Sequence, residues 1–412
     1  MSSGIVYIAG AGLSGLSAAV ALAAQGIRVE VLEATNAAGG RCRSYYDPAV
    51  DQIIDNGNHL ILSGNHSAQD YLRLIGSEKN FSGPAQTELA FAELPTGKRW
   101  TIRVNDGRLP WWTLDEKRRV PDTSASDYLA FAGLMRPGGG KIPDGLLWQR
   151  LVRPLLLAAL NTEPETASPA LIAATLRETI AKGGRAWRPR VAFPTLGAAF
   201  IDPAIAFVKQ RGGMFRFGQR LRNLVFSGPS VLGLQSTDAM VPISAEDRVI
   251  LALPPWAAQS LLPGLTVPDE FRAILSAHFR IAPQPGVAMI TGIIGGTAEW
   301  IFAFPDRISV TISNADRLMD GDREELAAVC WRDVVAVYGL PSALPPWQIV
   351  KERRATFAAT PAQEAKRPGA KTRWENLFLA GDWTATGLPA CIEGAVRSGR
   401  RAAELALGRG HV

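Results

Sequence analysis

Residues 5–15 read IVYIAGAGLSG, an apolar run that leads into the spacing G-x-G-x-x-G. This pattern predicts a strand, a tight turn and the start of a helix, the arrangement that holds a pyrophosphate in dinucleotide-binding folds. Gly10 permits the turn, Gly12 lets the backbone approach the phosphates, and Gly15 lets the helix pack on the strand. The helix begins with free N–H groups and a partial positive charge, which suits a diphosphate.

The next apolar run supports the same ligand. Small residues continue the helix to Ala24, Gly26 ends it, and residues 27–32 are typical of a second strand. Glu33 then lies at the carboxyl end of that strand, where its carboxylate can accept hydrogen bonds from ribose hydroxyls and disfavours a 2′-phosphate. An ordinary strand–helix–strand turn without a ligand is the weaker interpretation.

A glycine pair and a polar loop follow this unit. Gly40 and Arg41 stand directly after the predicted ribose-binding strand, and an arginine there can reach phosphate or carbonyl oxygens. Residues 55–59 read DNGNH, a turn-rich segment that contains Asn56 and Gly57 and ends at His59. His59 can face a cofactor or substrate, although a single histidine in a loop is more often structural.

The C-terminal segment points to the same kind of site. Residues 377–380 form an apolar run that ends at Gly381 and Asp382, and a helix is expected from Ile392. Asp382 is placed to accept hydroxyl hydrogen bonds beside a flavin pyrophosphate and ribityl chain. The N–H groups of the helix can face the flavin edge that becomes negative on reduction. Two segments far apart in the chain therefore predict two walls of one FAD site.

Composition narrows the class of protein. The 412 residues are 47% apolar and 20% charged, which is typical of a globular chain of two domains. The net charge of +6 favours an anionic partner such as a membrane surface. Nucleic acid is less favoured, because the sequence has no compact basic block with interleaved aromatic residues. Three widely spaced cysteines give no metal-ligand spacing and fit a reduced compartment. A cytoplasmic location is expected, with room for peripheral contact at the inner face of the membrane.

The pattern of elements predicts two intertwined domains of an α/β protein. We expect a discontinuous Rossmann-like FAD-binding domain over residues 1–80, 206–262 and 366–412, with an interleaved α+β substrate-binding domain over residues 81–205 and 263–365. Strands near 214–237 and at 248–253 are expected to rejoin the first sheet.

Two long apolar stretches need an interpretation of their own. The first, 281–304, is broken by Pro and Gly and is better explained by consecutive strands than by a transmembrane helix. The second, 146–157, carries Trp148 and two arginines and fits either a core helix or an interfacial membrane segment. The core interpretation is favoured.

The motifs resemble the FAD-dependent amine oxidase and phytoene desaturase superfamily over essentially the whole chain, with its glutathione-reductase-type FAD fold. Within it, the chain is most similar to the hydroxysqualene dehydroxylases, or squalene-associated FAD-dependent desaturases. Three runs carry that closer resemblance: residues 40–44 with 55–59, residues 159–168, and residues 381–390. The middle run is the more diagnostic because it lies outside the cofactor motifs.

The resemblance implies FAD as cofactor and a hydrophobic C30 isoprenoid, hydroxysqualene, as a substrate that is reductively dehydroxylated. It implies FAD contacts at Gly10, Gly12, Leu13, Ser14, Gly15, Glu33, Ala34, Gly40, Arg41, Asn56, Gly57, Leu221, Gly381, Asp382, Ile392 and Ala395. His59 is the candidate proton donor, because it lies in the loop after the Arg41 motif. The residues do not indicate the electron donor.

Three other functions stay open at this point. A carotenoid or phytoene-type desaturase would run hydride transfer in the opposite direction on a similar polyene. An amine oxidase is less favoured, because Leu388, Pro389 and Cys391 stand where an aromatic residue is expected and no lysine is near. A non-catalytic prenyl-lipid carrier would not need the intact flavin motifs at both ends.

Overall fold

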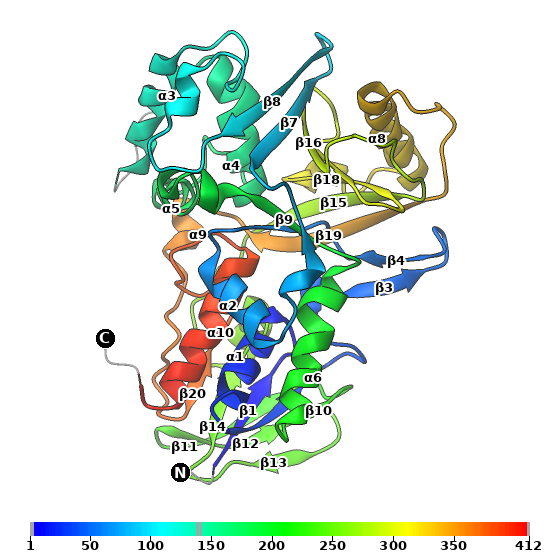
Figure 1. The fold of residues 1–412 in the computed structure, drawn as a ribbon. Coiled ribbons are helices and arrows are strands. Elements are labelled where there is room, and N and C mark those ends of the chain that lie inside the picture. The colour runs from blue at the N-terminus through cyan, green and yellow to red at the C-terminus, as the bar shows by residue number, and fades with distance from the viewer. Residues whose placement is uncertain (1–3, 137–139, 141, 410–412) are drawn as a thin grey trace.

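The computed structural model describes residues 4–136, 140 and 142–409. Figure 1 shows two stacked bodies, one around each of two large sheets, with the chain crossing several times between them. The lower body contains both terminal segments, and the upper body is built from the middle of the sequence. The predicted fold class, a Rossmann-like α/β unit with an interleaved α+β unit, is confirmed.

The lower sheet is five-stranded and parallel. Its order is β10 (Met214–Arg216), β2 (Arg28–Leu32), β1 (Ile5–Ala9), β14 (Arg248–Leu251) and β20 (Leu377–Leu379). Strands β1, β14 and β20 are almost wholly buried, which agrees with their continuous apolar sequences. All carboxyl ends meet at one edge, so the loops after these strands share one site.

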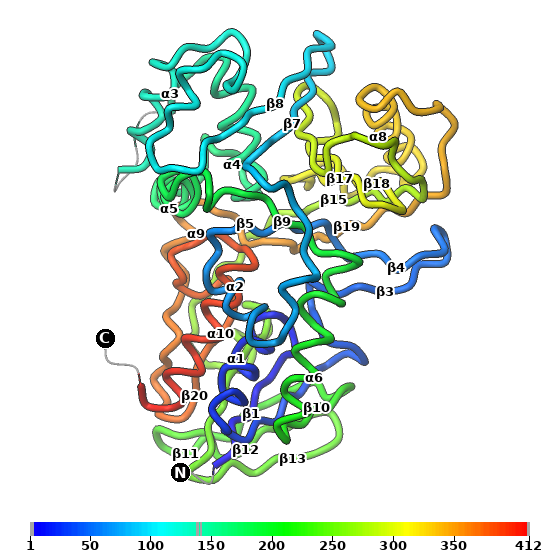
Figure 2. Tube along the Cα trace, in the orientation of Figure 1, coloured from blue at the N-terminus to red at the C-terminus, as the bar shows by residue number. Residues whose placement is uncertain are grey.

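Helices α1 (Leu13–Ala23) and α10 (Ile392–Ala406) lie side by side against this sheet, although the whole chain separates them (Figure 2). A Cβ on Gly399 would overlap the carbonyl oxygen of Ser14, so the two helices approach as closely as their backbones allow. The Ser17 hydroxyl donates to the carbonyl of Val396 over 2.8 Å and fixes the register of the pair. The contact joins the two ends of the chain.

The upper sheet is seven-stranded and mixed. Its order is β19 (Trp347–Phe357), β15 (Phe271–Phe279), β18 (Ile308–Ile312), β17 (Trp300–Ala303), β16 (Ile290–Ile294), β7 (Thr87–Glu93) and β8 (Lys98–Val104). Helix α8 (Arg323–Tyr338) packs on one face through an aliphatic cluster, while the other face joins the core that contains α4 (Arg153–Leu160) and α5 (Pro169–Glu178).

The remaining elements are shorter. The other helices are α2 (His66–Leu74), α3 (Ala125–Phe131), α6 (Asp202–Gln210), α7 (Pro255–Leu261) and α9 (Pro361–Glu364). The other strands are β3 (Ser44–Asp47), β4 (Gln52–Asp55), β5 (Leu60–Leu62), β6 (Phe81–Ser82), β9 (Pro189–Ala192), β11 (Asn223–Ser227), β12 (Ser230–Gln235) and β13 (Met240–Pro242).

One topological expectation was wrong in part. Strands β10 and β14 join the lower sheet as expected, but β11 and β12 do not; with β13 they form a separate three-stranded sheet. The tight turn at Gly228 folds β12 back antiparallel on β11, so the hairpin satisfies its own backbone groups. Asn376 holds this sheet beside β20 by bonding the N–H and carbonyl of Val231, each over 2.9 Å.

The two long apolar stretches have the structures that their patterns favoured. Residues 281–304 contain β16 and β17, and the chain from Trp148 to Leu160 is a π-helical turn that continues into α4 with Pro154 in its first turn. Trp148, Leu151 and Leu156 are buried, so the core interpretation is confirmed. Within residues 4–136, 140 and 142–409, no helix combines the length and apolar character needed to cross a membrane.

The division into domains at residues 80, 205, 262 and 365 stays a prediction. Every strand of the lower sheet falls within the segments assigned to the FAD-binding domain, and every strand of the upper sheet within those assigned to the substrate-binding domain. Strand β9 lies in a substrate-domain segment yet pairs with β5, so a small three-stranded sheet spans the two assignments.

Candidate active site

The turn between β1 and α1 has the geometry that its glycines predict. Gly10 has a φ of 103°, and a Cβ there would overlap the carbonyl oxygen of Ala252 at the end of β14. A Cβ on Gly15 would overlap the carbonyl oxygen of Gly10. A Cβ on Gly12, by contrast, would meet no protein atom within 4 Å. The turn is therefore closed toward the protein and open at Gly12, on the side where a ligand can approach.

Glu33 is fixed at the end of β2 by the loops around it. Its Oε2 accepts a hydrogen bond from the N–H of Ala11 over 2.8 Å, and its Oε1 accepts from the N–H and hydroxyl of Thr35. The N–H of Gln219 donates to the Glu33 carbonyl over 2.8 Å, which brings the loop with half-buried Leu221 next to the carboxylate. Ala34 is exposed on the same edge. A carboxylate offers about four acceptor sites, so Glu33 can still bind ribose hydroxyls.

The second glycine motif lies against the first. Gly39 forms a bridge with Gly12, and a Cβ on Gly40 would lie 3.4 Å from the Gly12 Cα. Arg41 follows and donates from Nη2 to Oδ1 of Asp382 over 2.7 Å and from Nη1 to the carbonyl of Ala355 over 2.5 Å. The predicted phosphate-side arginine and ribityl-side aspartate are thus brought into direct contact, and Arg41 also anchors β19.

The turn that carries Asp382 is held from behind by a buried cation. The Arg367 guanidinium donates to the carbonyl oxygens of Asp382, Trp383 and Thr384 over 3.0, 3.3 and 2.5 Å, and pairs with Glu364. The side chain of Asp382 is 7% exposed. Its carboxylate therefore has a fixed direction before any ligand binds.

The start of α10 completes this wall. Ile392 and Ala395 are buried against the lower core, and the hydroxyl of Ser398 accepts the N–H of Gly381 over 2.9 Å. The Sγ of Cys391 accepts the N–H of Gly394 and caps the helix. Burial raises the pKa of the Cys391 thiol to about 12, so it is neutral and not a nucleophile at physiological pH.

The polar loop 55–59 reaches the same site. Asn56 donates from Nδ2 to Glu352 of β19 over 3.1 Å, and a Cβ on Gly57 would lie 3.8 Å from Nε2 of His59. The His59 ring is half-buried; partial removal from water and the Arg41 charge lower its pKa to about 4, against the opposing effect of Asp382. His59 therefore lies within electrostatic reach of both groups and is a neutral imidazole at neutral pH.

These residues fit a dinucleotide flavin. The N-cap position of α1 is Gly12 and has no side-chain cap, so the first N–H groups of the helix are left for a pyrophosphate. Glu33 stands at the predicted ribose position, and Asp382 and the start of α10 lie where the opposite wall is predicted. Bound there, FAD would supply hydride chemistry, and the chain would supply binding, orientation and electrostatics.

Several supporting residues could not be found from the sequence. Arg367 and Glu352 act through contacts 15 and 296 residues away in the chain, and neither belongs to a motif. Ala252 could have been suspected, because it follows an apolar run that ends at a Pro pair.

The comparisons with known proteins agree with this site. Residues 13–407 match the family of flavin containing amine oxidoreductases. The chain is 53% identical to a hydroxysqualene dehydroxylase of Rhodopseudomonas palustris, over 98% of this chain and 99% of that one. It is 52% identical to a hydroxysqualene dehydroxylase of Sinorhizobium fredii, over 98% of each. The structure of cyclohexylamine oxidase from Brevibacterium oxydans superposes with a TM-score of 0.73 over 98% of each chain, at 17% identity, which shows the shared fold.

The amine oxidase resemblance inferred from the motifs is therefore confirmed, and so is FAD as the cofactor. The chain belongs to the family of flavin containing amine oxidoreductases and is an FAD-dependent enzyme of that family, with close relatives among the hydroxysqualene dehydroxylases.

Proposed function

We propose that the enzyme removes the hydroxyl group of hydroxysqualene reductively and forms squalene for hopanoid or related lipid synthesis. The observation that carries this proposal is the 47–53% sequence identity to three relatives named hydroxysqualene dehydroxylase, each over 98% of this chain. The matched residues include the predicted substrate-binding domain as well as the FAD motifs.

The core around the site supports an apolar substrate. One continuous cluster includes Phe302 of the upper sheet, Leu160 of α4 and Trp383 beside the Asp382 turn. Leu253, at the end of β14, and Ala390, before α10, pack against the same cluster. An isoprenoid bound between the flavin edge and the upper sheet would be surrounded mainly by hydrocarbon, which would stabilise it and exclude water from a cationic intermediate.

The proposed FAD contacts follow the geometry of the two walls. The pyrophosphate and ribose side is Gly10, Gly12, Leu13, Ser14, Gly15, Glu33, Ala34, Gly40 and Arg41, with Leu221 near the adenine. The ribityl and ring side is Asn56, Gly57, Gly381, Asp382, Ile392 and Ala395. These assignments rest on the positions of the residues around one edge of the lower sheet.

We propose that His59 has a more limited role than that of proton donor to the substrate hydroxyl. A pKa near 4 leaves the imidazole neutral at neutral pH. A neutral ring still has one N–H donor, and His59 lies beside the Arg41–Asp382 pair. In this proposal the ring orients the substrate hydroxyl by a hydrogen bond while the proton comes from elsewhere.

The His59→Phe variant separates these roles, because it keeps a ring of similar size but has no N–H donor. We expect normal flavin content and a kcat about 100-fold lower, as for other lost oriented hydrogen bonds at reacting oxygens. Because the wild-type ring is neutral above pH 5, the pH profile of kcat/KM between pH 6 and 9 should keep its shape in the variant. If the wild-type profile shows an ionisation in that range that the variant lacks, His59 itself donates the proton to the substrate hydroxyl. If kcat is unchanged in the variant, His59 has no role in the reaction.

A direct product assay tests the proposed reaction. The holoenzyme, reduced anaerobically, is incubated in parallel with hydroxysqualene, phytoene and a primary amine. We expect flavin reoxidation and squalene only with hydroxysqualene, measured by absorbance and mass spectrometry. Flavin that stays reduced in that sample contradicts the proposal. With oxidised enzyme, conversion of phytoene or of the amine identifies the desaturase or the oxidase.

We also propose peripheral contact with a membrane through one apolar patch. Its members are the exposed side chains Leu109, Trp111, Leu114 and Leu129, which are 79%, 53%, 71% and 75% exposed. The guanidinium of Arg118 lies 4.7 Å from the Trp111 ring centroid. Large apolar groups are rarely so exposed in a cluster, and an indole with an adjacent arginine suits the headgroup region of a bilayer.

Vesicle binding checks this patch. We expect wild-type protein to co-sediment with vesicles that contain anionic lipid, and the double variant Leu114→Asp, Leu129→Asp to bind about tenfold more weakly. Leu232→Asp changes another exposed leucine, on β12 of the separate three-stranded sheet, and should leave binding unchanged. Equal binding by the double variant and the control would exclude the patch as the contact.

A further inference from the structure

A buried layer of polar side chains separates the loop 55–58 from the upper sheet. Six side chains of β15, β18 and their surroundings form this layer, which we name the polar seam: Asp55, Asn58, Ser276, His278, Arg307 and Ser309. Ser276 and His278 alternate with the aliphatic residues of β15, so they share the face opposite α8. A polar layer is unusual between a sheet and its core.

The contacts within the polar seam are incomplete. Asn58 donates from Nδ2 to Thr311 over 3.1 Å, the Nδ1 of His278 lies 2.8 Å from the Ser309 hydroxyl, and Arg307 approaches Asp55 to only 3.9 Å. The residues Ser276, His278 and Arg307 are 1%, 0% and 2% exposed. They are thus shielded from bulk solvent but not saturated by protein hydrogen bonds.

Four buried polar atoms of the seam have no hydrogen-bond partner among the described residues: Asn58 Oδ1, Ser276 Oγ, His278 Nε2 and Arg307 Nε. The backbone of Asp55 makes a hydrogen-bonding contact with the His278 ring that opposes the lowering of its pKa, while Nε2 has no partner at full hydrogen-bond geometry. Buried polar groups are nearly always paired, and buried water typically makes about three bonds to groups of this kind. Two acceptors, one donor and one ring nitrogen in one layer match the bonding capacity of water.

The inner end of the polar seam meets the flavin site. A Cβ on Gly57 would lie 3.7 Å from Ser276 Oγ and 3.8 Å from His59 Nε2, so one glycine separates the seam from the candidate hydroxyl-orienting residue. The His59 ring in turn lies within reach of the Arg41 and Asp382 charges.

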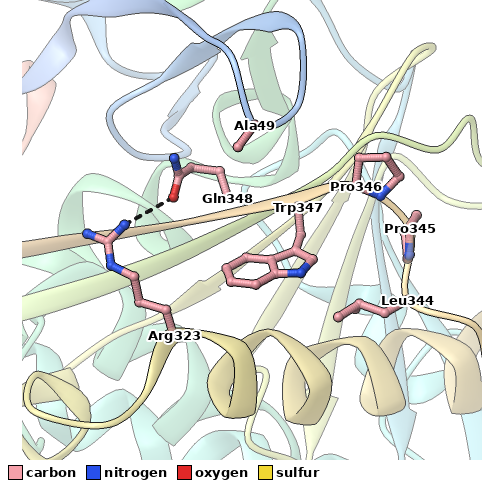
Figure 3. Close-up of a pocket in the computed structure, with 7 residues that line it drawn as sticks. All are labelled: Ala49, Arg323, Leu344, Pro345, Pro346, Trp347 and Gln348. Atoms are coloured by element: carbon pink, nitrogen blue, oxygen red, sulfur yellow. Dashed lines mark hydrogen bonds between the residues drawn. The ribbon is translucent and has the colours of Figure 1, made fainter.

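The outer end of the polar seam meets a surface pocket of about 550 Å³. Gln348 of β19 pairs in register with His278, donates to Asp47 over 2.7 Å, and lines the pocket with Ala49, Arg323 and the 344–347 segment. Figure 3 shows the Gln348 amide turned toward Arg323, with Trp347 beside it over α8. Polar groups thus extend from the surface, past His278 and Ser276, to Gly57.

We propose that ordered water fills the polar seam and carries protons from this pocket to the flavin site. The inference deepens the proposed function and rests on it for the use of the proton. In dehydroxylation the C–O bond breaks, both electrons stay with the oxygen, and that oxygen takes up a proton and leaves as water. The carbon receives a hydride from reduced FAD, which is oxidised. With His59 neutral, a route for the proton is required.

The charge state of His278 agrees with a relay through a neutral imidazole. Burial, with the Arg307 charge, lowers the pKa of His278 to about 3, so the ring is uncharged and can both accept and donate. Burial raises the pKa of Asp55, although Ser44 and the N–H of Leu196 hydrogen-bond its carboxylate.

Ser276 offers a matched pair of variants. Ser276→Thr keeps the hydroxyl, while Ser276→Val has the same shape without it, so the pair differs in one hydrogen-bonding group. The holoenzyme of each is photoreduced in weakly buffered solution with a pH indicator, and proton uptake is followed after the electrons arrive. We expect uptake in Ser276→Val to be at least about tenfold slower than in Ser276→Thr, with an increased solvent isotope effect.

Diffraction from the wild-type holoenzyme provides a readout that is independent of turnover. We expect ordered waters within hydrogen-bond distance of Ser276 Oγ and His278 Nε2, and loss of the first in Ser276→Val. Equal uptake rates in the two variants, or a seam without water, overturns the inference. Photoreduction needs no hydroxysqualene, so failure of the product assay with normal proton uptake would reject the proposed function and leave the water route in place.

Discussion

The Gly15→Ala variant is expected to lose its flavin. A Cβ at this position would overlap the carbonyl oxygen of Gly10 and lie 3.1 Å from the Cβ of Ala252. Neither neighbour can move freely, because the first is backbone of the turn and the second belongs to the end of β14. The overlap must therefore be relieved by moving α1 away from β1, at a cost of about 3 kcal/mol. That movement displaces the helix start that faces the pyrophosphate.

Gly12→Ala is the matched control because it adds the same methyl group three residues away. Gly12 has φ of −71° and ψ of 176°, which alanine adopts without strain, and its Cβ would meet no protein atom within 4 Å. We expect this variant to fold with wild-type stability as apoprotein and to bind FAD more weakly only because the methyl group enters the ligand's space. Gly15→Ala should lose both stability and flavin.

Two measurements separate these outcomes. The apoprotein of each variant is unfolded with urea, and FAD affinity is obtained from the quenching of flavin fluorescence. We expect Gly15→Ala to lose about 3 kcal/mol of unfolding free energy and roughly two orders of magnitude in FAD affinity. If Gly15→Ala has wild-type apoprotein stability while Gly12→Ala does not, the turn is not packed as described.

Local patterns were enough to place the three segments of the proposed FAD walls at one edge of the lower sheet. The glycine turn after β1, Glu33 at the end of β2 and Asp382 at the end of β20 each follow an apolar run directly. In a parallel sheet the carboxyl ends of strands share one edge, so three short segments could be placed together without knowledge of the rest. A flavin cofactor was predicted from the segments that meet at this edge.

The residues that hold the site in place could not be predicted from sequence patterns. Arg367 lies in the loop between α9 and β20 and belongs to no recognised motif, and its role depends on three carbonyl oxygens that converge only after β20 has joined the sheet. Ser276 and His278 follow the alternation of an ordinary strand, and nothing in the sequence says that polar groups of residues 55–58 cover them. The β11–β12 hairpin was misplaced because strand patterns do not specify the partner sheet.

The run 159–168, which carried the closer resemblance, proves to be a structural brace between α4 and the upper sheet. Asn161 ends α4 in a left-handed conformation, with φ of 48°. Its Nδ2 donates to Thr356 of β19 over 3.0 Å and to the carbonyl of Arg272 over 3.3 Å, and its Oδ1 accepts the N–H of Asn314 over 2.6 Å. Thr356 adjoins Ala355, whose carbonyl holds Arg41, so the brace also supports the flavin site.

Asn161→Ala is accordingly expected to be among the most destabilising single substitutions outside the FAD motifs. It removes three hydrogen bonds of a buried side chain and leaves the N–H of Asn314 without its acceptor. It also places a Cβ-bearing residue without a polar side chain in a left-handed conformation. Together these changes lower the free energy of unfolding by about 3–4 kcal/mol.

Asn161→Gly loses the same hydrogen bonds, but glycine adopts the left-handed conformation without strain. It should therefore be about 1 kcal/mol more stable than Asn161→Ala. Asn36→Ala, at an exposed position, is the control. Urea unfolding of the holoenzymes checks this order of stability. Equal midpoints for Asn161→Ala and Asn36→Ala would show that the Asn161 hydrogen bonds do not stabilise the fold.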